Sequence, residues 1–287
     1  MASSSNQADE RPLPSHRDRN LSTESVDGVY VMTATGDNSP FGPEALFGVL
    51  EFDGEGNFSG DLENNTGPSL GAREVETFST SGTVEVTARG MGNLTISGVP
   101  GLETASLIVT DTRILGRRII ATKLSFTLQQ ASASGNTITG QLTRRQFSAP
   151  LPPEALTGNY GFVNKGLGGL TTGTAIGDVN WDHETSIVAG DFVFSAVDPT
   201  GQPVVVEFFS AGPFTPSGDA DGTGTTFSNT TGGSSHYVVT EVTRIRGRVV
   251  AKEIFFVPEF LDGVGNFSPA LMRRRPDPDI SPFDWNY

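Results

Sequence analysis

The sequence predicts an all-β protein built from two tandem antiparallel β-barrels that are related by internal duplication. The composition favours many short strands joined by tight turns, because the chain holds 35 glycines and 18 prolines and few long helix-forming runs. A hexapeptide with five of six positions identical occurs twice, as Thr112–Arg117 and Thr243–Arg248, at a spacing of 243 − 112 = 131 residues. The length of 287 residues accommodates two domains of ordinary size.

Other positions repeat at nearly the same spacing along both halves. Tyr30 and Tyr160 open the two copies and lie 160 − 30 = 130 residues apart. Further matches pair Gly60 with Gly190, Gly82 with Gly212, Gly92 with Gly224, Gly135 with Gly265 and Arg144 with Arg274. Shared turn residues predict a shared topology, because turns fix the register of β-strands. The hexapeptide itself is interpreted as the hairpin corner before a long apolar strand, with Gly116 and Gly247 in the turns.

The duplication also predicts where the domains begin and end. We expect a flexible polar tail over residues 1–24, a first barrel over 25–147, a short extended proline-rich linker over 148–155 and a second barrel over 156–275. Residues 276–287 form a proline-interrupted tail with three aromatic side chains, Phe283, Trp285 and Tyr287. Such a tail is expected to pack on its own barrel or to cover a barrel mouth.

Each copy is expected to form an up-and-down barrel of eight or nine short strands. In the first copy the strands are predicted at residues 29–35, 45–52, 57–63, 73–79, 83–88, 93–97, 104–110, 117–128 and 137–144. Asp53-Gly54 is a hairpin signal, since it supplies the positive φ angles of a tight turn. Closure removes the exposed edges of the sheet, and eight strands leave room for side chains or for one small ligand.

Two alternatives remain for the charges that follow the hexapeptide. Lys123 and Glu253 occupy equivalent positions with opposite charge. They either face one another across an interface in which the two barrels pack as a pseudo-dimer, or they are two independent solvent-facing charges.

The charge and the absence of cysteine exclude several classes of function. A net charge of −14 repels nucleic acid and anionic membranes. No cysteine is present, so disulfides and thiolate chemistry are excluded. The N-terminus lacks the features of a secretory signal and no window offers a membrane span, which predicts a cytoplasmic protein. Only 3 of the 19 basic residues are lysines, a bias associated with GC-rich bacterial genomes.

The histidines do not suggest a metal centre or a hydrolase. Asp182, His183 and Glu184 are neighbours and would point alternately to opposite faces of a strand, so they cannot converge on one ion. Ser235 and His236 lie outside any nucleophile-elbow motif. The glycine-rich segments precede no helix that could bind a phosphate. No metal site and no cofactor are therefore expected.

The predicted site lies in the second copy, which is richer in aromatic residues and holds two of the three histidines. An acid turned into a barrel lumen would have a raised pKa suited to proton transfer, and Glu207 has the most apolar neighbours of the strand carboxylates. The predicted catalytic residues are Glu207, His183 and Tyr237. The predicted ligand-binding residues are Trp181, Phe208, Phe209, His236 and Tyr160. The same aromatic residues could instead fill a core, and the matching positions of Tyr30 and Tyr160 favour a structural role.

Four segments carry a resemblance to a known family. The Gly-x-Tyr opening at Gly28–Tyr30, the hairpin Phe52–Gly60, the strand Ser81–Val86 and the turn Gly92–Thr95 resemble small lipocalin-like barrels of the allene oxide cyclase type. Barrels of this type include plant allene oxide cyclases and bacterial cyclases of polyketide pathways, which fold a flexible apolar substrate without a metal or redox cofactor. None of their functional residues matches a position of this chain.

The resemblance implies a cofactor-independent cyclase or isomerase that folds a hydrophobic polyketide-type substrate in natural-product biosynthesis. A ring-closing reaction of this kind needs an apolar cavity that holds a reactive conformer and few charged groups. Two alternatives stay open. The chain could be a non-catalytic barrel that binds a small hydrophobic ligand, or a structural or interaction protein whose barrels are filled.

Overall fold

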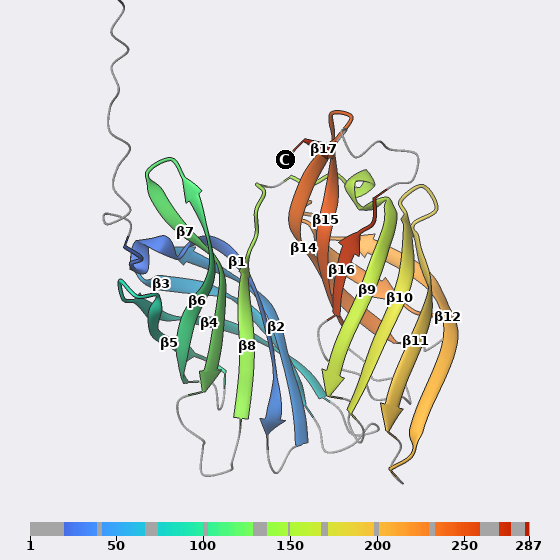
Figure 1. Cartoon of the computed structure of the whole chain (residues 1–287), viewed down its shortest axis with the longest axis horizontal. Coiled ribbons are helices and arrows are strands. Elements are labelled where there is room, and N and C mark those ends of the chain that lie inside the picture. The colour runs from blue at the N-terminus through green and yellow to red at the C-terminus, as the bar shows by residue number, and fades with distance from the viewer. Residues whose placement is uncertain are drawn as a thin grey trace, which may run out of the picture.

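The structure of the chain, a computed structural model, describes residues 20–38, 42–66, 74–99, 103–128, 137–148, 150–167, 172–197, 201–229, 233–258, 270–276 and 285–286. Two β-barrels stand side by side in it (Figure 1). The first contains β1 (Asp27–Asn38), β2 (Gly42–Asp53), β3 (Asn57–Thr66), β4 (Glu74–Val86), β5 (Met91–Ser97), β6 (Thr104–Leu115), β7 (Arg118–Leu128) and β8 (Thr137–Arg144). The second contains β9 (Gly158–Leu167), β10 (Thr172–Asp182), β11 (Ile187–Val197), β12 (Pro203–Pro216), β13 (Thr223–Phe227), β14 (Ser234–Ile245), β15 (Arg248–Pro258) and β16 (Ala270–Arg274).

Both sheets close on themselves with the up-and-down order that the sequence predicts. In the first barrel each strand pairs with the next, and β8 returns to pair with β1. In the second, β16 pairs with β9 and β13 pairs with β14, which closes the ring of strands. A short strand from the C-terminal tail, β17 (Trp285–Asn286), adds to β14 at Arg244 and Ile245. The prediction of two antiparallel eight-stranded barrels is confirmed for the part of the chain that the structure describes.

The strand register shows that the repeated hexapeptide is one residue out of step with the repeated fold. Leu115 pairs with Arg118 and Ile245 with Arg248, so the two hairpins are 248 − 118 = 130 residues apart rather than 131. Gly116 (φ 62°) therefore fills the first position of its two-residue turn, whereas Gly247 (φ 81°) fills the second, after Arg246 (φ 50°). The two corners use different mirror-image hairpin turns. Each copy also has a bulge at the same place, after Val109 and after Val239.

One predicted turn in each copy is a continuous strand. The break expected between residues 79 and 83 does not exist, because β4 runs through Gly82, and β12 runs likewise through Gly212. A Cβ atom on Gly82 would lie 1.9 Å from the Thr95 carbonyl oxygen, and one on Gly212 would lie 1.5 Å from that of Phe227. These glycines permit close approach of a neighbouring strand rather than a turn.

A short 3₁₀ turn closes one end of each barrel. The turn Thr23–Ser25 precedes β1, and the turn Pro153–Leu156 precedes β9 inside the segment predicted as an extended linker. Ala155 and Leu156 are buried in the core of the second barrel. Most residues predicted as the N-terminal tail lie outside the described residues. No helix in the described part of the chain is long and apolar enough to cross a membrane.

The two barrels contact each other through an apolar cluster. Val31 and Phe47 on the outer face of the first barrel pack with Val238, Phe255 and Val257 on the outer face of the second. His236 pairs with Glu63 beside this cluster, and the guanidinium of Arg145 donates to the Asp221 carbonyl oxygen at 2.9 Å. The positions equivalent to Val238, Phe255 and Val257 in the first barrel are Ile108, Ser125 and Thr127, so the two copies contribute unlike surfaces.

We predict that a charge at Val238 uncouples the two barrels. Val238 is 1% exposed, so Val238→Asp buries an unpaired carboxylate in the interface. Calorimetry of this variant should show two separate unfolding transitions in place of one. Ile108→Asp is the matched control, because Ile108 is the equivalent residue and is 47% exposed. An unchanged single transition in Val238→Asp would contradict the prediction.

Candidate binding site

The second barrel contains an apolar cavity. Its volume is about 160 Å³. Six phenylalanines line it: Phe162, Phe192, Phe194, Phe208, Phe227 and Phe256. Phe192 stacks on Phe208 with ring centroids 5.3 Å apart, and Phe162 meets Phe192 edge to face at 5.1 Å. Aromatic side chains in these arrangements form a rigid and closely packed wall.

The cavity exists because four inward-facing positions carry smaller or more polar residues than in the first barrel. The strand registers of the two barrels show which positions are equivalent. Leu46 of the first barrel is equivalent to Ala175 of the second, Leu94 to Thr226, Ile96 to Ser228 and Phe58 to Val188. The four residues of the first barrel are all at most 4% exposed and fill its core. Their four counterparts all line the cavity. The same fold therefore has a filled core in one copy and a cavity in the other.

Neutral polar groups occupy part of the cavity wall. Asn164, Thr226 and Ser235 are each less than 9% exposed, and Ser210 and Ser228 share a hydrogen bond of 2.8 Å. Four of the five equivalents in the first barrel are apolar, at Ala34, Leu94, Ala105 and Ile96, and the fifth, Thr80 in place of Ser210, is polar in both copies. None of the cavity-lining residues that the structure describes is titratable. The site can supply hydrogen bonds to a neutral ligand but no charge.

The floor at the closed end of the second barrel contains three of the predicted aromatic residues, Trp181, Tyr237 and Tyr160. Trp181 packs against Phe214 and Tyr237 with ring centroids 4.9 and 5.0 Å away. Trp181 and Tyr237 are at most 1% exposed, and neither lines the cavity. Within the described residues, Trp181 Nε1 and the Tyr237 hydroxyl have no hydrogen-bond partner. Burial raises the pKa of Tyr237, so this phenol is neutral at physiological pH.

Tyr160 is held in the same floor by its hydroxyl. The hydroxyl donates to the Leu156 carbonyl at 2.8 Å and lies 3.2 Å from that of Ala251, while Arg274 donates to it at 3.1 Å. Tyr30 repeats the arrangement in the first barrel, where its hydroxyl donates to the Ala121 carbonyl at 2.6 Å. Both tyrosines therefore hold the first strand of a barrel to the strand that follows the hexapeptide.

Of the predicted site residues on β12, the structure places only Phe208 at the cavity. Glu207 and Phe209 are exposed on the outer face, because side chains on a strand alternate. Glu207 was predicted as a site residue because of its apolar neighbours. Two of these neighbours, Val205 and Phe209, share its outer face. Glu207 therefore does not enter the lumen, which its predicted role as a desolvated acid or base requires.

The two predicted histidines lie apart from each other and from the cavity. His183 is in the turn after β10, where Nδ1 lies 3.2 Å from the Thr157 hydroxyl oxygen. His236 faces the first barrel and pairs with Glu63. The structure thus brings neither histidine together with Glu207, and His236 and Tyr237 are neighbours on β14 that point to opposite faces of the strand. In the described residues, no group of three or more His, Asp or Glu side chains could hold a metal ion.

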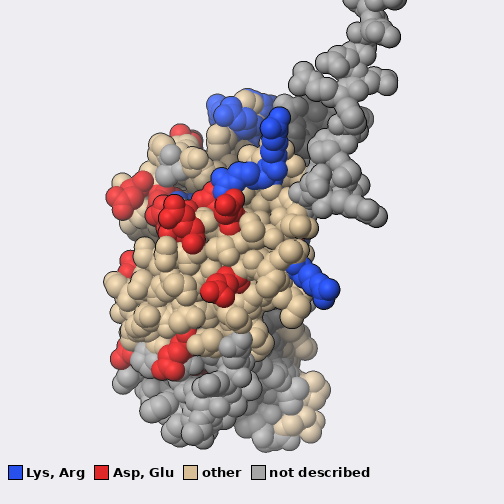
Figure 2. Space-filling model, turned by 90° about the vertical axis from the view of Figure 1, so that its left-hand side faces the viewer, with Lys and Arg blue, Asp and Glu red and all other residues tan. Residues whose placement is uncertain are grey.

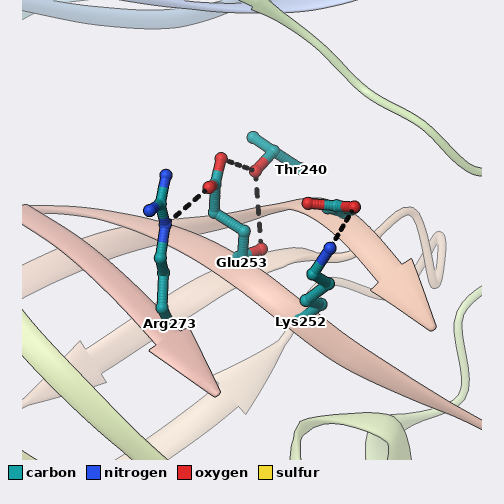
Figure 3. Close-up of polar contacts among 5 residues, drawn as sticks. Thr240, Lys252, Glu253 and Arg273 are labelled. Carbon is teal, nitrogen blue, oxygen red and sulfur yellow. Dashed lines mark hydrogen bonds and ion pairs between the residues drawn. The ribbon is translucent and has the colours of Figure 1, made fainter. Parts of the chain in front are cut away.

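Glu253, for which the sequence left two alternatives, is a buried carboxylate on the outer face of β15. Glu253 is 6% exposed and accepts hydrogen bonds from Thr240 at 3.0 Å and Arg273 at 3.2 Å (Figure 3). It lines a groove between the barrels together with Lys123, but the described residues show no ion pair between the two. Glu253 is therefore neither an independent solvent-facing charge nor the partner of Lys123.

Of the residues that line the cavity, sequence reasoning found only Phe208. Among those missed are Phe162, Phe192, Phe194 and Phe256, which lie on strands whose inward face could not be assigned from composition alone. A usable signal was present in Phe192-x-Phe194, since two large residues at a spacing of two share a face of a strand.

We predict that Tyr160→Phe lowers the free energy of unfolding by about 1–3 kcal/mol near neutral pH, because two buried carbonyl groups lose a donor. Tyr237→Phe is the matched control and should cost little, since its hydroxyl has no partner among the described residues. Denaturant unfolding of both variants measures the difference. Equal losses would contradict the structural role of the Tyr160 hydroxyl.

The stabilisation by Tyr160 should also disappear in alkali. Burial raises the pKa of Tyr160 to about 12, above the value of about 10 in an unfolded chain. The contribution is therefore fully present below about pH 10 and is lost as the pH rises towards about 12. The stability difference between the wild type and Tyr160→Phe, followed by unfolding at increasing pH, should shrink across this window. A stability difference that stays constant between about pH 10 and about pH 12 would contradict this prediction.

Known proteins give little further information about this site. No protein-family model and no curated protein matches the chain. The crystal structure of kievitone hydratase from Nectria haematococca is 8% identical, covers 88% of this chain and 91% of its own, and has a TM-score of 0.29. A protein described as ATTH from Nitrosomonas europaea is 9% identical, covers 90% and 94%, and has a TM-score of 0.28. Similarity at this level assigns neither a family nor an activity, and the allene oxide cyclase-type relationship stays a prediction.

Proposed function

We propose that this protein binds a small, neutral and largely apolar molecule in its second barrel, while the first barrel serves as a filled structural copy. The observation that carries the proposal is the contrast between the two lumens. Equivalent positions hold Leu46 and Leu94 in the first and Ala175 and Thr226 in the second, and the cavity lies at these smaller residues.

The size of the cavity limits the ligand. An apolar cavity of about 150 Å³ is large enough to bind benzene, so a cavity of about 160 Å³ fits one ring or a short branched chain. A longer substrate would extend past the walls that the described residues form. Ordered phenylalanine side chains around such a ligand favour binding, because little conformational entropy is lost.

The chemistry of the wall limits the ligand further. A buried charge without a partner is costly, and no titratable side chain lines the cavity in the described residues. Asn164, Thr226 and Ser235 can each exchange one hydrogen bond with a hydroxyl or carbonyl group. A ring that carries one neutral polar substituent therefore suits the cavity best.

Catalysis of a ring closure or isomerisation is the second candidate. It is favoured by the phenylalanine-lined cavity, because a reaction controlled by conformation needs a shaped apolar space and no acid or base. Incubation with linear unsaturated carbonyl compounds, followed by mass spectrometry, distinguishes catalysis from ligand binding alone. Product formation that Ala175→Leu abolishes would favour catalysis, and saturable binding without product would favour a binding protein.

We predict that toluene and phenol bind the wild type and that benzoate does not. The carboxylate of benzoate would lie in an apolar site without a cation. Phenol should bind more tightly than toluene by a factor of about ten, since one buried hydrogen bond contributes about 1 kcal/mol or somewhat more. Isothermal titration and ligand-induced shifts in melting temperature measure the three affinities. Failure of both neutral compounds to bind would contradict the proposal.

Refilling the cavity provides the matched variants. Ala175→Leu and Thr226→Leu introduce the residues of the first barrel, so each should weaken toluene binding at least about tenfold without loss of folding. The reverse change, Leu46→Ala in the first barrel, should destabilise the protein by about 2–5 kcal/mol. It should leave binding in the second barrel unchanged. Binding that survives both refilling variants would place the ligand elsewhere.

A further inference from the structure

A continuous apolar row runs around the outer face of the second barrel. Its members are successive cross-strand neighbours from β14 to β11: Val238, Phe255, Leu271, Val163, Ile176 and Val193. Cross-strand neighbours on one face of a sheet lie in contact with each other. The six residues therefore form one surface.

Only half of this row is covered. Val238, Phe255 and Leu271 pack against Val31, Phe47 and Val49 of the first barrel. The other half is exposed, with Val163 at 44%, Ile176 at 56% and Val193 at 37%. Phe209 lies diagonally next to Val193 and is 56% exposed. We call the surface formed by Val163, Ile176, Val193 and Phe209 the β9–β12 face. It is continuous with an existing apolar interface.

The equivalent surface of the first barrel is an interface. Strand register matches Val163, Ile176 and Val193 with Thr33, Phe47 and Glu63. Thr33 is 9% exposed, Phe47 is 5% exposed, and Glu63 pairs with His236 of the second barrel. The duplicated fold thus uses this surface to bind another barrel in the first copy, whereas Val163, Ile176 and Val193 of the second copy stay exposed in the part of the chain that the structure describes.

The free side of the first barrel has a different character. Figure 2 shows acidic side chains spread over this side, with Lys and Arg mainly towards the top. Contiguous exposed apolar residues rimmed by charges are instead typical of an interaction site. β10, β11 and β12, which carry Ile176, Val193 and Phe209, lie on the side of the second barrel away from the first (Figure 1).

Two of the charges around the β9–β12 face, Glu207 and Arg273, complement each other under a twofold rotation, and Asp191 and the Asp178–Arg275 ion pair lie on the same face. Glu207 follows Val193 on β12 at one end of the row, and Arg273 lies beside Leu271 on β16 at the other end. A twofold axis parallel to β10 would place β12 of one copy over β16 of another. Glu207 of each copy would then lie near Arg273 of its partner, with Ile176 close to the axis.

We propose that the β9–β12 face binds the same face of a second copy of this chain and forms a twofold-symmetric dimer. The surface is isologous, so the same residues contribute from both copies. This interface is independent of the cavity, because Val163, Ile176, Val193 and Phe209 point away from the lumen.

Sedimentation velocity of the full chain across the micromolar range tests the dimer. We expect the wild type to dimerise and Ile176→Glu to weaken dimerisation at least about tenfold. Ile114→Glu is the matched control, because Ile114 is 51% exposed on the first barrel and receives the same charge. A wild type that stays monomeric, or a dimer that Ile176→Glu leaves intact, would overturn the proposal. Val193→Lys provides a second variant if Ile176→Glu fails to fold.

Cross-linking tests the symmetry. The chain has no cysteine, so Ile176→Cys introduces a single thiol close to the expected axis. A short bis-maleimide should cross-link Ile176→Cys into a dimer and leave Ile114→Cys monomeric, because face-to-face sheets lie about 10 Å apart, beyond the Cα separation of about 7 Å that a direct disulfide spans. Equal cross-linking of both variants, or growth of the wild type into larger oligomers, would exclude a twofold contact at this face.

Discussion

An eight-stranded barrel has a lumen only just wide enough for its own side chains, so the volume of the inward-facing residues decides whether it becomes a core or a cavity. The two copies of this chain illustrate this constraint on the same backbone. Leu46, Leu94 and Ile96 fill the first lumen, whereas Ala175, Thr226 and Ser228 leave space in the second. The lost volume is not restored by the phenylalanines of the second barrel, because these side chains stack on one another around the space.

Closure of the barrels depends on residues that the copies share. Gly82 and Gly212 let neighbouring strands approach where any Cβ atom would collide with a backbone oxygen. Tyr30 and Tyr160 hydrogen-bond buried carbonyl groups at equivalent points. Duplication has kept these structural residues, while the lumen and the outer surface have diverged. Such a division lets one copy change its interior without loss of the fold.

The surfaces have diverged as strongly as the interiors. The outer faces that join the barrels carry Val238, Phe255 and Val257 on one copy but Ile108, Ser125 and Thr127 at the same positions of the other. The junction is therefore apolar where Val31 and Phe47 of the first barrel meet these residues of the second, and a groove lined by Lys123 and Glu253 adjoins it. An unequal junction of this kind leaves part of the apolar row of the second barrel exposed.

The sequence by itself determined the duplication, the β class and the approximate strands, because turn residues and a period of two are local properties. It could not determine which face of β12 turns inward, since Val205 and Phe209 make the outer face as apolar as the inner one. That choice moved Glu207 out of the predicted site and left Phe208 in it. Alignment of the two hexapeptides by sequence placed the copies one residue out of step with the strand register, because the glycine of each hairpin can occupy either turn position.

Only the tertiary structure decided where the cavity lies and what each histidine contacts. A cavity depends on side-chain volumes summed over eight strands that are distant in sequence, and no local pattern carries that sum. The pairing of His236 with Glu63 likewise depends on how one barrel lies against the other.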